Sequence, residues 1–167
     1  LGLWRGRWRR GRIRLARSFF GVGVGARTWR YGLYTPGGLR DEQEAPLVVL
    51  LHGCGQRALG FAHASGWTRF ADRSHVRLLC PEQRRLANMW RCWNWFLPLA
   101  QRGHGELEVI DAMIEEVRAR VRVEDGSIAV VGLSAGGALA ALLAFHRPDK
   151  FGAVVAVAGL PLTGGSS

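Results

Sequence analysis

The sequence of 167 residues is long enough for one domain with a hydrophobic core and short for two. Its apolar content of 48% and charged content of 22% are those of a globular protein and argue against wholesale disorder. No run approaches the roughly 18 apolar residues of a membrane-spanning helix. The start of the chain is basic but has no continuous apolar segment typical of a secretory signal.

The net charge of +10 is concentrated in one segment. Twenty-two of the twenty-three basic residues are arginine, and seven of these lie within the first seventeen residues, where there is no acidic residue. Subtracting those seven from +10 leaves +3, an ordinary value. A basic nucleic-acid-binding module remains an alternative that predicts salt-sensitive DNA binding lost on deletion of residues 1–17. We expect no nucleic-acid partner.

The first half of the chain begins with a segment of irregular composition. Residues 1–26 mix Arg, Gly and Trp without a helical or strand period, and we predict an arm or linker there. Aromatic residues over 27–35 predict a strand. The continuous apolar run over 47–51 predicts a strand buried on both faces, which ends at His52-Gly53-Cys54-Gly55.

The second half alternates helices and strands. We predict helices over 66–75, 106–120 and 135–146, and strands over 76–80, 127–131 and 151–158, with an irregular aromatic connection over 82–102. This alternation predicts a mostly parallel sheet with helices on both faces, the α/β class, formed by residues 27–167.

Gly132-Leu133-Ser134-Ala135-Gly136 follows a predicted strand and precedes a predicted helix. In that context Gly-x-Ser-x-Gly is a nucleophile elbow, which leaves the serine exposed on a tight turn. The next backbone N–H, that of Ala135, lies at a helix N-terminus and can bind an oxyanion. We therefore predict that Ser134 is a nucleophile.

A second glycine-containing loop, His52-Gly53-Cys54-Gly55, follows the first buried strand. In esterase-like hydrolases this loop supplies the other oxyanion donor through a backbone N–H, here that of Cys54. Gly53 and Gly55 allow close approach of the substrate oxygen. One such donor contributes about 3–4 kcal/mol of transition-state stabilisation.

Six motifs in order give the chain a family resemblance over about residues 27–162. Together they resemble the polyhydroxybutyrate depolymerase family of esterases, related to feruloyl and acetyl-xylan esterases. The motifs are Pro46–Gln56, Ser65-Gly66-Trp67, Ala71-Asp72, Cys80-Pro81-Glu82-Gln83, Arg91–Phe96 and Gly132–Gly137.

This resemblance implies an α/β-hydrolase fold and a serine hydrolase acting on esters of short 3-hydroxyalkanoates. It implies that Ser134 is the nucleophile and that the backbones of Cys54 and Ala135 form the oxyanion hole. Export is common in the family, so we expect an extracellular protein, or otherwise a cytoplasmic one. Export would permit a Cys54–Cys92 disulfide. Trp93 and Trp95 either line a cleft for polyester chains or cover the sheet.

The resemblance also implies further strands that carry a catalytic Asp and then a His. Only thirty-three residues follow Ser134, and they contain His146 and Asp149 in the reverse order. At 1.5 Å per helical residue, His146 lies about 18 Å along the axis from Ser134. We expect a chain that lacks the C-terminal strands and is inactive, or nearly so, alone. The alternative is a non-catalytic polyester- or glycan-binding remnant.

The remaining histidines and cysteines predict no further chemistry. We predict that His52 is a structural residue of its loop. The spacing of His63, His75, His104 and His146 offers no metal site, and we expect no cofactor. We predict that Cys80, inside a predicted strand, is an inert buried thiol.

Overall fold

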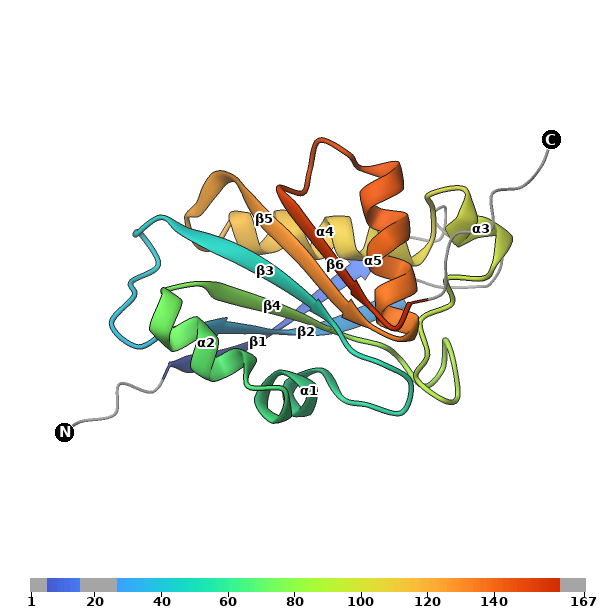
Figure 1. The fold of residues 1–167 in the computed structure, drawn as a ribbon, viewed down its shortest axis with the longest axis horizontal. Coiled ribbons are helices and arrows are strands. Elements are labelled where there is room, and N and C mark those ends of the chain that lie inside the picture. Colours follow the sequence, from blue (N-terminus) through green and yellow to red (C-terminus); the bar gives the residue numbers. More distant parts are fainter. Residues whose placement is uncertain (1–5, 16–26, 160–167) are drawn as a thin grey trace.

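The computed structural model describes residues 6–15 and 27–159 (Figure 1). Segments with apolar runs or alternating patterns form the strands of its sheet. Within these residues six strands pair in the order β1-β2-β4-β3-β5-β6. Their bounds are β1 Arg7–Leu15, β2 Arg27–Thr35, β3 Ala45–Leu51, β4 Arg77–Glu82, β5 Val123–Leu133 and β6 Ala153–Val157.

The predicted parallel arrangement is confirmed for the later strands. β3 pairs in parallel with β4 and with β5, and β5 pairs in parallel with β6, whereas β2 pairs antiparallel with β4. β6 ends the described sheet, and its residues Val155 and Val157 are 48% and 47% exposed. The carboxyl ends of β3 and β5 therefore lie side by side, at the edge where parallel sheets bind ligands.

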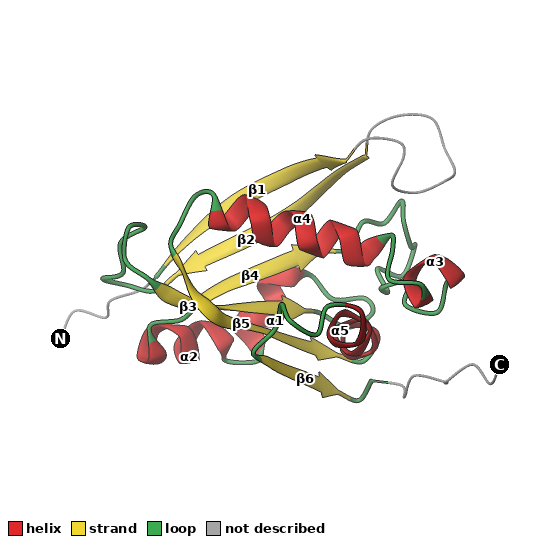
Figure 2. Cartoon of the chain, turned by 90° about the horizontal axis from the view of Figure 1, so that it is seen from above, coloured by secondary structure: helices red, strands yellow, loops and turns green. Residues whose placement is uncertain are grey.

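Side chains that alternate along β3 face two separate cores. Leu47, Val49 and Leu51 pack with helices α4 (Glu106–Arg118) and α5 (Ala135–His146). Val48 and Leu50 pack with helices α1 (Ala58–Ala64) and α2 (Trp67–Ser74). Figure 2 shows α4 and α5 lying over the sheet in this arrangement. Burial on both faces explains why this strand is a continuous apolar run.

The helices agree with the sequence where the pattern is long. α2 (Trp67–Ser74), α4 (Glu106–Arg118) and α5 (Ala135–His146) confirm three predicted helices. Two short helices were not predicted. α1 (Ala58–Ala64) and α3 (Pro98–Gln101) have seven and four residues, too few for a clear helical period.

β1 corrects the prediction for the N-terminal segment. The prediction of an irregular arm is wrong for Arg7–Leu15, which pairs antiparallel with all of β2, while residues 1–5 and 16–26 lie outside the described residues. Gly11 and Ile13 are buried between exposed arginines, a period-2 pattern that the high arginine content obscured. Arg9 and Arg7 bind Asp41, and the hydrogen bond from Arg9 is the main reason that the pKa of Asp41 is lowered.

β4 also extends past its predicted end at Cys80, through Pro81 to Glu82. Proline has no N–H to donate to a neighbouring strand. Pairing of β4 with β3 stops at Leu79, and Pro81 lies opposite Tyr31 of β2. The strand can therefore continue without that donor.

Gly11 gives a test of whether β1 belongs to the sheet. A Cβ at Gly11 would lie 2.0 Å from Cζ of the buried Tyr31 ring. We expect Gly11→Val to lower the free energy of unfolding by about 1–3 kcal/mol through overpacking. Arg12→Val, on the exposed face of the same strand, should change it by less than about 0.5 kcal/mol. Urea denaturation measures both, and equal effects would contradict the pairing.

Candidate active site

A sharp turn between β5 and α5 carries Ser134. β5 ends at Leu133 and α5 begins at Ala135, so Ser134 alone connects them, with φ 54° and ψ −119°. Its side chain is exposed, and its N–H donates to the carbonyl oxygen of Val157 at 2.8 Å. A non-glycine residue at such a positive φ costs about 1–3 kcal/mol. The predicted strand, turn and helix are confirmed.

Two glycines allow this turn. A Cβ at Gly132 would lie 2.0 Å from the carbonyl oxygen of Gly136, and a Cβ at Gly136 would lie 2.3 Å from that of Leu51. Real Cβ atoms essentially never come so close to a backbone oxygen. The end of β5, the first turn of α5 and the end of β3 are therefore in direct backbone contact.

The turn His52–Gly55 lies against Ser134. Leu51 pairs with Gly132, so the two loops leave the sheet at the same level. A Cβ at Gly53 would lie 3.7 Å from the Cβ of Ser134, and Cys54 is exposed. The structure thus brings the two predicted loops together. The role of the Cys54 and Ala135 N–H groups as oxyanion donors stays a prediction.

His52 is buried beneath this turn. Its Nδ1 lies 2.8 Å from the carbonyl oxygen of Gly53, and its Nε2 lies 3.2 Å from the N of Gln83. Because the Gln83 N–H must donate, Nε2 is the acceptor and Nδ1 carries the proton. Burial lowers the pKa of His52, with the Gly53 carbonyl opposing that shift. These contacts support the predicted structural role.

His146, as expected, does not reach Ser134. It ends α5, at the opposite end of the helix from Ser134, and its Nε2 lies 3.0 Å from the carbonyl oxygen of Gln101. Asp149 is exposed beyond it. Neither residue is placed to accept a proton from the Ser134 hydroxyl.

The two tryptophans differ. Trp93 is fully buried, and its Nε1 donates to the carbonyl oxygen of His52 at 3.0 Å. Burial in the core leaves Trp93 no open face, which favours the second of the two alternatives, that it covers the sheet. Trp95 is half-buried and packs edge-on against Phe96 with ring centroids 5.9 Å apart. Its role in substrate binding stays a prediction.

Cys54 and Cys92 form a disulfide with their Cα atoms 4.2 Å apart. The pairing that the resemblance implied is therefore present. Cys80 is a free, buried thiol whose pKa is raised by burial, as its place inside a strand predicted. A buried thiol of this kind is unreactive.

Sequence reasoning missed two polar residues beneath the site. Gln83 is fully buried and Glu106 is 6% exposed, and the Gln83 Nε2 donates to Glu106 Oε1 at 2.5 Å. Gln83 ends one of the six motifs, and Glu106 is the first residue of α4, where the helix dipole favours an acid. The motif that ends at Gln83 and the acidic residue at the start of a predicted helix were both visible in the sequence, but neither indicated that the two side chains would bind each other.

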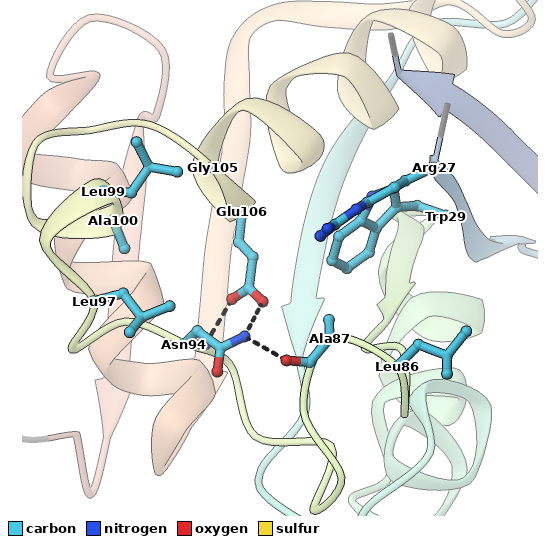
Figure 3. A pocket seen from close by; sticks show the side chains of 10 residues that line it. All are labelled: Arg27, Trp29, Leu86, Ala87, Asn94, Leu97, Leu99, Ala100, Gly105 and Glu106. Carbon is cyan, nitrogen blue, oxygen red and sulfur yellow. Dashed lines mark hydrogen bonds between the residues drawn. The ribbon is translucent and has the colours of Figure 1, made fainter. Parts of the chain in front are cut away.

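A cavity opens beside Glu106. Figure 3 shows Glu106 and Asn94 on one wall and Arg27 and Trp29 across from them, with Leu97 and Ala100 nearby. Glu106 accepts hydrogen bonds from Asn94 in this view.

The part of the chain that the structure describes contains no group of three His, Cys, Asp or Glu residues able to hold a metal ion. None of the helices described there has the length and apolarity to cross a bilayer.

Solved structures establish the class of fold. An acetyl xylan esterase from Aspergillus awamori superposes with a TM-score of 0.66 at 16% identity, covering 86% of this chain and 50% of that one. A ferulic acid esterase superposes with a TM-score of 0.67 at 19% identity, covering 97% of this chain and 64% of that one. The fold is that of the α/β-hydrolase esterases.

The sequence then gives the family. Residues 29–166 match the family described as Esterase PHB depolymerase, and the chain belongs to that family of carboxylic ester hydrolases. Poly(3-hydroxyalkanoate) depolymerase C of Paucimonas lemoignei is 36% identical over 118 residues, 70% of this chain and 28% of that protein. Feruloyl esterase B of Neurospora crassa is 27% identical over 68% of this chain and 39% of that protein. The chain thus spans well under half the length of these relatives.

His52 gives a pH-dependent prediction. Its lowered pKa means that the unfolded chain binds a proton at a higher pH than the folded chain does, so acidification below the ordinary value of 6.5 favours unfolding. The stability that neutral His52 contributes is present above 6.5 and is lost as the pH falls through its folded pKa. We expect NMR titration of the ring to give a midpoint below 6.5. A midpoint at or above that value would contradict the buried neutral ring.

Proposed function

We propose that this chain carries the nucleophile and the oxyanion hole of a serine esterase. The Ser134 Oγ attacks the ester carbonyl carbon, and the N–H groups of Cys54 and Ala135 stabilise the oxyanion. The carbonyl re-forms as the alcohol leaves, which gives an acyl-serine, and water then releases the acid. The nucleophile is regenerated at the end of this cycle.

One observation carries the proposal. Ser134 is an exposed residue at φ 54° at the start of a helix, in a turn whose neighbouring glycines have no room for a side chain. A turn that only reverses the chain would accept glycine at that position without strain. Strain of this kind, held by the surrounding backbone, is typical of a catalytic residue.

The proton of the Ser134 hydroxyl requires a base. In this fold the partners follow the nucleophile in the order Asp or Glu, then His. In the described ranges, the His52 ring is bonded to Gly53 and Gln83 and the His146 ring to Gln101. We therefore expect the chain by itself to show only residual turnover.

We propose polyhydroxyalkanoates, or related esters, as the substrates of the whole protein. Family membership supports an ester. Leu86, Met89 and Trp90 are 90%, 77% and 74% exposed on the connection that carries Cys92, which the disulfide joins to Cys54, and we propose that these apolar side chains contact the substrate. Exposed apolar side chains suit an apolar polyester chain.

The same exposed side chains support a second candidate function. A chain that keeps Leu86, Met89 and Trp90 without a working base would bind polyester and not hydrolyse it. The disulfide between Cys54 and Cys92 supports an extracellular location for either function, because such bonds persist in oxidising compartments.

Ester hydrolysis in imidazole buffer tests the nucleophile, because imidazole can supply the general base. We expect the chain to hydrolyse p-nitrophenyl butyrate about tenfold or more faster than Ser134→Ala under these conditions. Ser74→Ala, which removes an exposed hydroxyl from α2, should match the unsubstituted chain.

Equal rates for the chain and Ser134→Ala would contradict the proposed nucleophile. Sedimentation with poly(3-hydroxybutyrate) granules then tests the second candidate. Binding to the granules with equal rates would support a polyester-binding protein, and the absence of both would overturn both candidates.

A further inference from the structure

The segment 83–97, here called the Cys92 loop, is tied to the turn that carries Cys54. The disulfide joins Cys54 to Cys92, and the Gly55 N–H donates to the carbonyl oxygen of Trp90 at 2.7 Å. Trp93 and Gln83 each donate to His52, at 3.0 Å to its carbonyl oxygen and 3.2 Å to its ring. The position of the Cys54 N–H therefore depends on the position of this loop.

The carboxylate of Glu106 holds the Cys92 loop through three hydrogen bonds. Its Oε1 accepts from the Gln83 Nε2 at 2.5 Å and from the Asn94 Nδ2 at 2.8 Å, and its Oε2 accepts from the Asn94 N–H at 2.7 Å. Figure 3 shows the two bonds with Asn94. Glu106 thus binds both ends of the segment between Gln83 and Asn94.

Gln83 transmits this constraint to the turn. Its Nε2 also donates to the carbonyl oxygen of Cys92 at 2.9 Å, and its backbone N–H donates to His52. Its Oε1 accepts from the Arg84 N–H at 2.9 Å, which fixes the orientation of the amide. Gln83 therefore connects Glu106 to both residues that hold Cys54: its side chain binds the Cys92 carbonyl, and its backbone N–H binds the His52 ring.

The chemistry at position 106 is specific to a carboxylate. Three N–H donors converge on the two oxygens of Glu106. A carboxylate accepts at both oxygens, whereas a glutamine amide has one acceptor and one donor. In either orientation, glutamine would place an NH₂ group against at least one of these N–H groups. Glu106→Gln therefore breaks the network with almost no change in shape.

We propose that Glu106, acting through Gln83, is a positioning residue that holds the Cys54 backbone N–H beside Ser134. The catalytic role of this positioning rests on the proposed function. The hydrogen-bond network from Glu106 to the Cys54 turn can be tested without measuring turnover.

Hydrogen exchange followed by NMR tests the geometry. The reporters are the Gly55 amide and the Trp93 indole N–H, which bond to Trp90 and His52. We expect both to exchange about tenfold or more faster in Glu106→Gln, relative to the Leu50 amide in the core strand β3. Glu115→Gln, an exposed position on the same helix, is the matched control and should leave them unchanged.

Gln83→Met provides a second variant that removes the relay and keeps the volume. Its effect on the two reporters should match that of Glu106→Gln, and the double variant should add little, because both substitutions break one network. In imidazole buffer we expect Glu106→Gln to lower kcat for p-nitrophenyl butyrate without raising KM, since the oxyanion donor acts in the transition state.

The outcomes separate the two proposals. Faster exchange at the reporters without any Ser134-dependent turnover would support the positioning network and overturn the esterase. Reporter rates that change no more than in Glu115→Gln, or only in parallel with the Leu50 amide, would overturn the positioning role whatever the turnover.

Discussion

Backbone contact among three segments is the constraint on which the site depends. Gly132 and Gly136 approach within distances that leave no room for a Cβ, and Gly136 is pressed against the carbonyl of Leu51. The end of β5, the start of α5 and the end of β3 are thereby fixed to one another. Ser134 lies within the turn that these contacts constrain and has a positive φ of 54°.

Other elements of the structure hold the segments around that contact in place. β3 is buried on both faces, which holds its carboxyl end rigidly beside the turn. The next turn carries Cys54 and is held by the Cys92 loop, which in turn rests on Glu106. Burial raises the pKa of Glu106, while the hydrogen bonds from Gln83 and Asn94 oppose that shift.

Local pattern was enough to predict the elbow and the strand that supports it. The Gly-x-Ser-x-Gly sequence lies between a clear strand and a clear helix, and the run over 47–51 is too apolar for an exposed strand. β1 was missed because its inward positions include Gly11, which carries no apolar signal and is needed only because Tyr31 fills the space above it. Glu106 and Gln83 were missed because they are 23 residues apart and their pairing depends on the tertiary fold. For Trp93 and Trp95 the choice between lining a cleft and covering the sheet stayed open, because sequence cannot say which of two nearby tryptophans faces inward.

A crystal structure of the chain with butylboronic acid tests the central claim most directly, because a boronate forms a tetrahedral adduct with a serine oxygen. The account predicts boron bonded to Ser134 Oγ and one boronate oxygen about 2.7–3.1 Å from the N atoms of both Cys54 and Ala135. An adduct whose oxygens all face solvent, or a Cys54 N–H turned away from Ser134, would contradict it.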